Sequence, residues 1–134
     1  MSQHTHRFEA DGADNAAQQH AAEQQALRDI AEVPAVEVIS SAAVHLMSAA
    51  AVKCGLAEDG PEGSGADLAD LDEARKLITA LAGLVTAGST EIGDHHARPL
   101  RDGLRSLQLA FREASAHPDR PGMGPGEKYT GPVA

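Results

Sequence analysis

The hydrophobic pattern of the chain predicts three helices between two polar ends. The first apolar segment, Val36–Val52, consists almost entirely of apolar or small residues, and it carries no formal charge between Val38 and Val52. Alanine and unbranched aliphatic residues favour helix, and a helix that is apolar all round has to be buried on most sides. We therefore predict a buried helix from about Ala35 to Gly55, since glycine suits a helix end.

Two amphipathic segments follow this helix. From about Asp70 to Gly88, apolar residues recur at the helical spacing i, i+3, i+4, i+7. Asp70 and Glu73 are typical of a capping box at its start, with Asp67 as an alternative cap, and Gly88 is expected to close it. The third helix is expected to begin near Pro99 after a loop over 89–96 and to end before Pro118. Its apolar residues are spaced to form a packing seam: Leu100, Leu104, Leu107, Phe111 and Ala114.

The two ends lack the apolar residues that a core needs. No large aliphatic residue lies between Phe8 and Leu27, so we predict a disordered arm over residues 1–26, in which 15–25 could form nascent helix. Residues 118–134 are rich in proline and glycine, and we predict a disordered tail there. The predicted fold class is all-α, with a helical domain over 27–117 that contains a small antiparallel three-helix unit over 35–116.

The composition predicts a thin core. Aromatic residues make up 2% of the 134 residues, and Phe111 is the only one expected in the core. Small domains of this kind bury little surface, and association with further copies compensates for it. We therefore expect a homo-oligomer, formed through small residues on the first helix: Ser41, Ala42, Ser48 and Ala49.

Charge and cysteine content narrow the functional classes. The net charge of −9 argues against a generally basic nucleic-acid binder. The single cysteine, Cys54, excludes an internal disulfide and suits a reducing cytoplasm. A membrane span needs roughly 20 apolar residues, and the first helix is shorter and flanked by Glu37 and Lys53. Since no secretory signal precedes it, we expect a cytoplasmic protein without a membrane partner.

The three predicted helices resemble a bacterial family catalogued as domain of unknown function eighteen forty-four, and the actinobacterial branch is the most similar. The resemblance covers residues 27–133 and rests on V-E-V-I-S-S-A-A-V-H-L-M (36–47), D-L-D-E-A-R-K-L-I-T-A-L-A-G-L (70–84), P-L-R-D-G-L-R-S-L-Q-L-A-F-R-E (99–113) and P-G-E-K-Y-T-G-P-V (125–133). It implies a small helical cytoplasmic protein without assigned catalytic residues. Genes of this branch often lie near genes for translation initiation factors and ribosomal proteins, which implies a translation partner.

Three groups of residues are candidates for binding. Arginines recur at helical spacing, with Gln108, on the face opposite the leucine seam. They could contact RNA phosphates, form a solvated face or dock the acidic arm: Arg98, Arg101, Arg105 and Arg112. His95 and His96 could donate metal ligands, although no metal-ligand motif accompanies them. In the tail, Lys128, Tyr129 and Thr130 could form a motif that orders on a partner, or they could belong to an inert solvating tail. His45 is expected to be a structural core histidine.

These features predict a non-enzymatic helical interaction module without a cofactor. The sequence holds no phosphate-binding loop, nucleophile motif or paired-carboxylate site that would indicate an enzyme. We expect the module to self-associate and to be an accessory of the translation machinery. A weak RNA binder acting through the four arginines is one alternative, and a small metal-binding protein using His95 and His96 is the other.

Overall fold

The computed structural model describes the backbone of residues 2–133 and the side chains of residues 12–133. Its helices are α1 (Ser2–Glu32), α2 (Ala35–Lys53), α3 (Leu71–Ile92), α4 (Asp94–Ala114) and the short α5 (Glu127–Thr130), with a 3-10 helix, η1 (Gly65–Leu68), ahead of α3. No strand occurs within residues 2–133, where Gly60 and Gly63 form an isolated bridge. Contacts divide the chain into two units, Met1–Pro34 and Ala35–Ala134.

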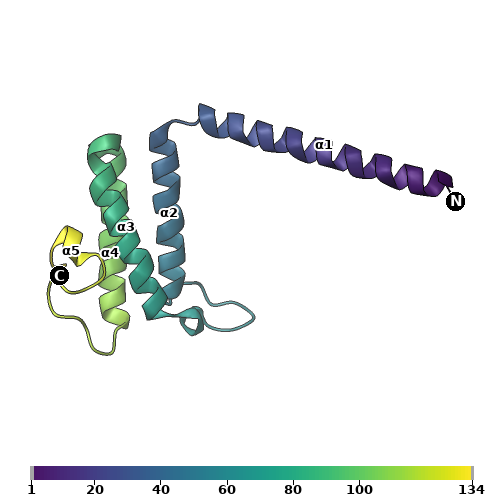
Figure 1. Ribbon diagram of the computed structural model, residues 1–134. Coiled ribbons are helices and arrows are strands. Elements are labelled where there is room, and N and C mark those ends of the chain that lie inside the picture. The colour runs from purple at the N-terminus through teal and green to yellow at the C-terminus, as the bar shows by residue number, and fades with distance from the viewer. Residues whose placement is uncertain (1, 134) are drawn as a thin grey trace. The chain divides into compact units, whose positions relative to one another are not determined.

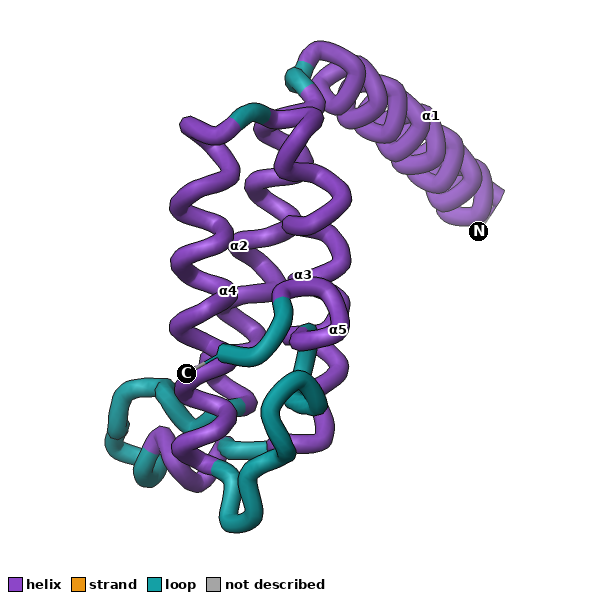
Figure 2. Tube along the Cα trace, turned by 90° about the vertical axis from the view of Figure 1, so that its left-hand side faces the viewer, coloured by secondary structure: helices purple, strands orange, loops and turns teal. Residues whose placement is uncertain are grey.

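In the second unit, α2, α3 and α4 form the predicted antiparallel three-helix unit (Figures 1 and 2). Ile78 and Leu81 of α3 are fully buried at its centre. The predicted seam of α4 faces them, since Leu104 and Phe111 are each 3% exposed. From α2, only the small side chains of Ala43 and Ala50 are buried. The all-α fold class and the alternating helix directions are therefore confirmed.

Gly103 marks the crossing of α4 over α2. A Cβ atom at this position would clash with Sδ of Met47, so the glycine leaves room for the Met47 side chain between the two helices. Glycine inside a helix costs about 1 kcal/mol relative to alanine. The space that the glycine leaves for Met47 is the structural reason for a glycine at this position.

The predicted cap of α3 is confirmed, but the full capping box and the predicted end are not. The amide of Asp70 donates to the carbonyl of Lys53 and not to the side chain of Glu73. Asp70 is the N-cap, and its carboxylate accepts a hydrogen bond from the Glu73 amide at 3.2 Å. The predicted stop at Gly88 is wrong, because α3 continues to Ile92 and Gly88 is buried against the side chain of Ile39. Gly93, at φ 83°, alone joins α3 to α4, so the predicted loop over 89–96 does not exist and Pro99 lies inside α4.

The amino-terminal arm is helical in the structure. We predicted a disordered arm over residues 1–26, whereas the described backbone from Ser2 to Glu32 forms helix α1. It agrees with the structure in burial, because every side chain described there, 12–32, is exposed. The alanine, glutamine and glutamate content that favoured helix over 15–25 accounts for the helical backbone.

The carboxyl-terminal tail contradicts the prediction of disorder over 118–134 at residues 118–133, and Ala134 lies outside the described residues. Residues 118–133 fold back on α3 and α4, as Figure 2 shows, and they contain α5 and the buried side chain of Val133. Glycines at 122, 126 and 131 have φ values of 86°, 74° and 79°, which only glycine adopts readily. The residues that favour disorder by composition therefore make the tight turns of a packed segment.

Candidate interaction surfaces

One side of α2 is apolar and exposed. Val38, Val44 and Val52 expose 49%, 50% and 38% of their surface, because α3 and α4 cover only the opposite side of the helix. The prediction that this helix is buried on most sides is therefore wrong. We call this surface the α2 face, and it consists of Val38, Ser41, Ala42, Val44, His45, Ser48 and Val52.

The residues predicted for self-association lie on or beside the α2 face. Ser41, Ala42 and Ser48 are exposed, and Ala49 is half-buried at its edge. His45 is exposed at the middle of the face, so the expectation of a core histidine is wrong. α2 is also long and apolar enough to cross a membrane, as judged by length and composition alone.

The four arginines do not form one uniform stripe. Arg98 and Arg101 both donate to the carboxylate of Asp94, with an N–O distance of 3.3 Å for Arg98. The hydrogen bond from Arg101 is the main reason why the pKa of Asp94 lies below its ordinary value. Arg112 instead donates to the main-chain carbonyl of Val133 at 3.1 Å, so it holds the tail.

Gln108 joins α4 to the tail through two hydrogen bonds. Its side chain is 5% exposed and donates to the carbonyl of Pro125 and to the hydroxyl of Thr130, both at 3.1 Å. The sequence placed Gln108 on the polar face with the arginines, which is wrong because the folded tail covers it. The signal in the sequence that could have predicted this burial is the position of Gln108 directly after Leu107, a residue of the packing seam.

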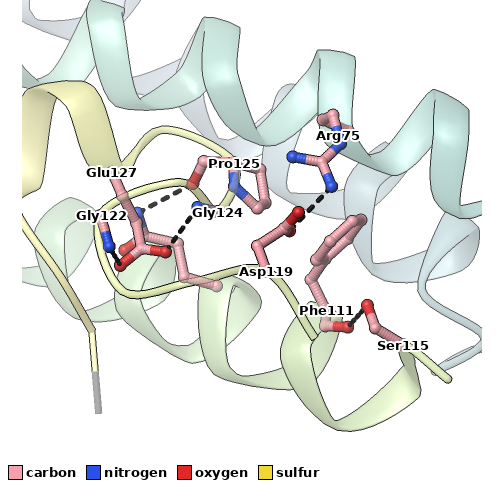
Figure 3. A network of polar contacts seen from close by, with 9 residues as sticks. Arg75, Phe111, Ser115, Asp119, Gly122, Gly124, Pro125 and Glu127 are labelled. Atoms are coloured by element: carbon pink, nitrogen blue, oxygen red, sulfur yellow. Dashed lines mark hydrogen bonds and ion pairs between the residues drawn. The ribbon is translucent and has the colours of Figure 1, made fainter. Parts of the chain in front are cut away.

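The carboxylate of Glu127 organises the tail from within. Its oxygens accept hydrogen bonds from the amides of Gly124 and Val133, both at 2.8 Å, and from the amide of Gly122 at 3.4 Å. Figure 3 shows this carboxylate turned towards Gly122 and Gly124. Charge-assisted hydrogen bonds of this kind are roughly twice as strong as neutral ones, so Glu127 closes the turn formed by the glycines.

A second anchor joins the tail to α3. Arg75 donates to the carboxylate of Asp119 at 2.8 Å, a contact that Figure 3 also shows. The guanidinium group of Arg75 lies 5.0 Å from the centre of the Phe111 ring, within the range of a cation–π contact. Arg75 therefore connects the tail, α3 and α4 at the end of the core.

The predicted tail motif is part of this packed segment. The ring of Tyr129 packs against Gly83 of α3, where a Cβ atom would lie 3.5 Å from the ring. Lys128 places its ammonium group 5.1 Å from the centre of the same ring. Both side chains are exposed, so a role in binding stays a prediction, but the segment orders on its own domain rather than requiring a partner.

A cavity of about 400 Å³ lies where the tail meets α3 and α4, and we call it the tail cavity. Both Arg101 and Arg105 line it, so it gathers two of the predicted arginines. Its other walls come from Val85, Thr86 and Ser89 of α3, from Leu104 and Gln108 of α4, and from Tyr129, Thr130, Pro132 and Val133 of the tail.

The predicted metal ligands lie at the start of α4. The rings of His95 and His96 meet edge to face, with their centres 5.2 Å apart, and both residues are exposed. Among the described residues, no three His, Cys, Asp or Glu side chains form a group that could hold a metal ion. The pair therefore stays a pair of adjacent histidines without a third ligand in the described part of the chain.

Comparison with known proteins concerns the three-helix unit. A family described as "Domain of unknown function (DUF1844)" matches residues 35–113, which span α2, α3 and α4. No curated protein and no solved structure matches the chain.

Proposed function

The chain belongs to this family of unknown function, and on that premise we propose that it is a non-enzymatic helical interaction module. We propose that its first partner is a second copy of itself, bound through the α2 face. The observation that carries this proposal is the exposure of Val38, Val44 and Val52 on a helix whose other side is packed in the core.

Burial of the α2 face would stabilise a dimer. Complete burial of a large aliphatic side chain contributes roughly 1.5–3 kcal/mol, and the three valines each expose between 38% and 50% of their surface. A two-fold interface uses the same patch on both subunits, so every valine counts twice. The small residues Ser41, Ala42 and Ser48 between the valines allow the two helix backbones to approach closely.

Charge favours this face over the rest of the surface. Two copies that each carry a net charge of −9 repel one another wherever acidic residues meet. The α2 face carries no formal charge between Val38 and Val52, so two identical patches can meet there without repulsion. His45 is the only titratable residue of the α2 face, at its centre, where a two-fold axis would bring both copies of it together.

Light scattering coupled to size exclusion tests the proposal. We expect the wild-type chain to show twice the mass of one chain and Val44→Glu to show the mass of a single chain, because the variant would bury two like charges. Leu68→Glu is the matched control, since Leu68 is 56% exposed but lies on η1. A wild-type chain that is monomeric and instead sediments with phosphatidylcholine vesicles would assign the face to a membrane and contradict the proposal.

We propose a component of the translation machinery as the second partner. The support for this is the gene neighbourhood of the family branch that the sequence resembles. Sedimentation of the chain with purified ribosomes, compared with a matched acidic protein of similar size, tests it. A chain that stays in the supernatant at low salt would contradict it.

RNA is an alternative partner, favoured by the exposure of the Arg98 and Arg101 side chains, which is 73% and 46%. The shared carboxylate of Asp94 weighs against it, because it neutralises part of their charge. Filter binding at low salt distinguishes the cases. Affinity that is unchanged in an Arg101→Ala/Arg105→Ala double variant would exclude this alternative.

A further inference from the structure

The tail cavity has the size and lining of a small-molecule site. Its volume of about 400 Å³ lies within the roughly 300–1,000 Å³ range of ligand pockets. Its apolar part comes from Val85, Leu104 and Val133, which are 4%, 3% and 9% exposed. Such a surface suits a short hydrocarbon or ring portion of a ligand.

The polar part of the lining is cationic. Arg101 and Arg105 lie on the same side of α4, one turn apart, and both line the cavity. None of the described lining residues is an Asp or a Glu, although the chain carries a net charge of −9. Asp94 lies outside the lining and accepts hydrogen bonds from both Arg98 and Arg101, so it neutralises part of their charge.

The remaining polar groups fall into two classes. Ser89 donates its hydroxyl to the carbonyl of Val85, and Gln108 donates its amide to the tail, so both serve the fold. Thr86 and Tyr129 are exposed at the cavity, where their hydroxyl groups can donate to a bound molecule. Cationic and hydroxyl donors beside an apolar surface match a ligand with a negative head and an apolar body.

We propose that the tail cavity binds a small organic anion with a carboxylate or phosphate head and a short apolar body. The guanidinium groups of Arg101 and Arg105 receive the head, because their planar forks match carboxylate and phosphate oxygens. The body lies against Val85, Leu104 and Val133. Since the tail supplies one wall, bound ligand stabilises the docked tail, as any ligand stabilises the state that binds it.

Titration of the isotope-labelled full-length chain with hexanoate, hexyl phosphate, inorganic phosphate and hexan-1-ol tests this proposal by NMR. We expect saturable shifts of the amides of residues 129–131 and 133 with the two amphipathic anions, weaker binding of inorganic phosphate, and none of hexan-1-ol. The bound anions should also slow tryptic cleavage after Lys128. Comparison of hexanoate with hexyl phosphate identifies the preferred head group.

Variants locate the site. Arg101→Gln and Arg105→Gln should each weaken binding of the preferred anion about tenfold, which corresponds to about 1.4 kcal/mol. Arg98→Gln is the matched control, because Arg98 shares Asp94 with Arg101 but does not line the cavity. Thermal unfolding shows whether each variant is folded. Two arginine variants are used, so that the site can still be tested if one of them does not fold.

Four results would overturn the proposal. They are equal binding of hexan-1-ol, equal binding of inorganic phosphate, no saturable shift with either amphipathic anion, and an equal loss of binding in Arg98→Gln.

Discussion

The side-chain amide of Gln108 donates to the carbonyl of Pro125 and to the hydroxyl of Thr130, each 3.1 Å away. Pro125 and Thr130 lie on either side of Glu127, whose carboxylate closes the tail from within. One buried residue of α4 therefore holds the tail at both ends of α5, and it also lines the tail cavity.

Replacement of Gln108 by leucine should release the tail. Gln108→Leu keeps a similar volume but leaves the carbonyl of buried Pro125 without its donor, which costs about 1–3 kcal/mol. We expect a lower free energy of unfolding in urea and faster tryptic cleavage after Lys128. Ser106→Ala, at an exposed position of the same helix, should leave both quantities unchanged. Equal cleavage rates in Gln108→Leu and the wild type would show that Gln108 does not hold the tail.

The two glycines that flank α5 allow a matched comparison. Gly126 and Gly131 have similar positive φ values, 74° and 79°, which cost a residue with a side chain roughly 1–2 kcal/mol. A Cβ atom at Gly126 would also lie 2.6 Å from Cβ of Ala82, whereas nothing lies within 4 Å of one at Gly131. Overpacking typically adds 1–3 kcal/mol. We therefore expect Gly126→Ala to destabilise the chain more than Gly131→Ala does, as measured by urea unfolding; equal losses would contradict the close contact.

Asp94 should make stability depend on pH in the acid range. Its pKa in the folded chain is lowered below the ordinary value of 3.8, first by the hydrogen bond from Arg101 and then by the charge of Arg101. A carboxyl whose pKa is lower in the folded state stabilises it above the unfolded pKa, and this contribution is lost as the pH falls through the folded pKa. The urea midpoints of the wild type and Asp94→Asn should therefore differ at neutral pH and converge in acid. A difference that grows towards low pH would have the wrong sign.

The local patterns of the sequence account for most of the three-helix unit. The uncharged run of α2, the Asp70 cap and the leucine seam of α4 are signals between residues close in sequence, and each one appears in the structure. Gly88 shows where such signals fail. A glycine can end a helix, or it can lie within a helix where a neighbour packs closely. At Gly88 the close neighbour is Ile39 of α2, and the local sequence does not show that contact.

The tail and the cavity could not be predicted in the same way. The contacts that fold the tail join residues far apart in sequence, such as Arg75 with Asp119 and Gln108 with Pro125. Composition reports high proline and glycine content but not that three glycines turn the backbone towards Glu127. The sequence predicted self-association through small residues of this helix, but it did not predict that Val38, Val44 and Val52 would stay exposed beside them within one chain.

The most direct test of the central claim is oxidative cross-linking of His45→Cys. The account predicts rapid disulfide-linked dimer formation, because position 45 lies at the centre of the α2 face, near the proposed two-fold axis. The wild type should remain uncross-linked, since its only cysteine, Cys54, is buried and 5% exposed, and Leu68→Cys should do the same because it lies outside the face. Cross-linking of His45→Cys no faster than that of Leu68→Cys would contradict the account.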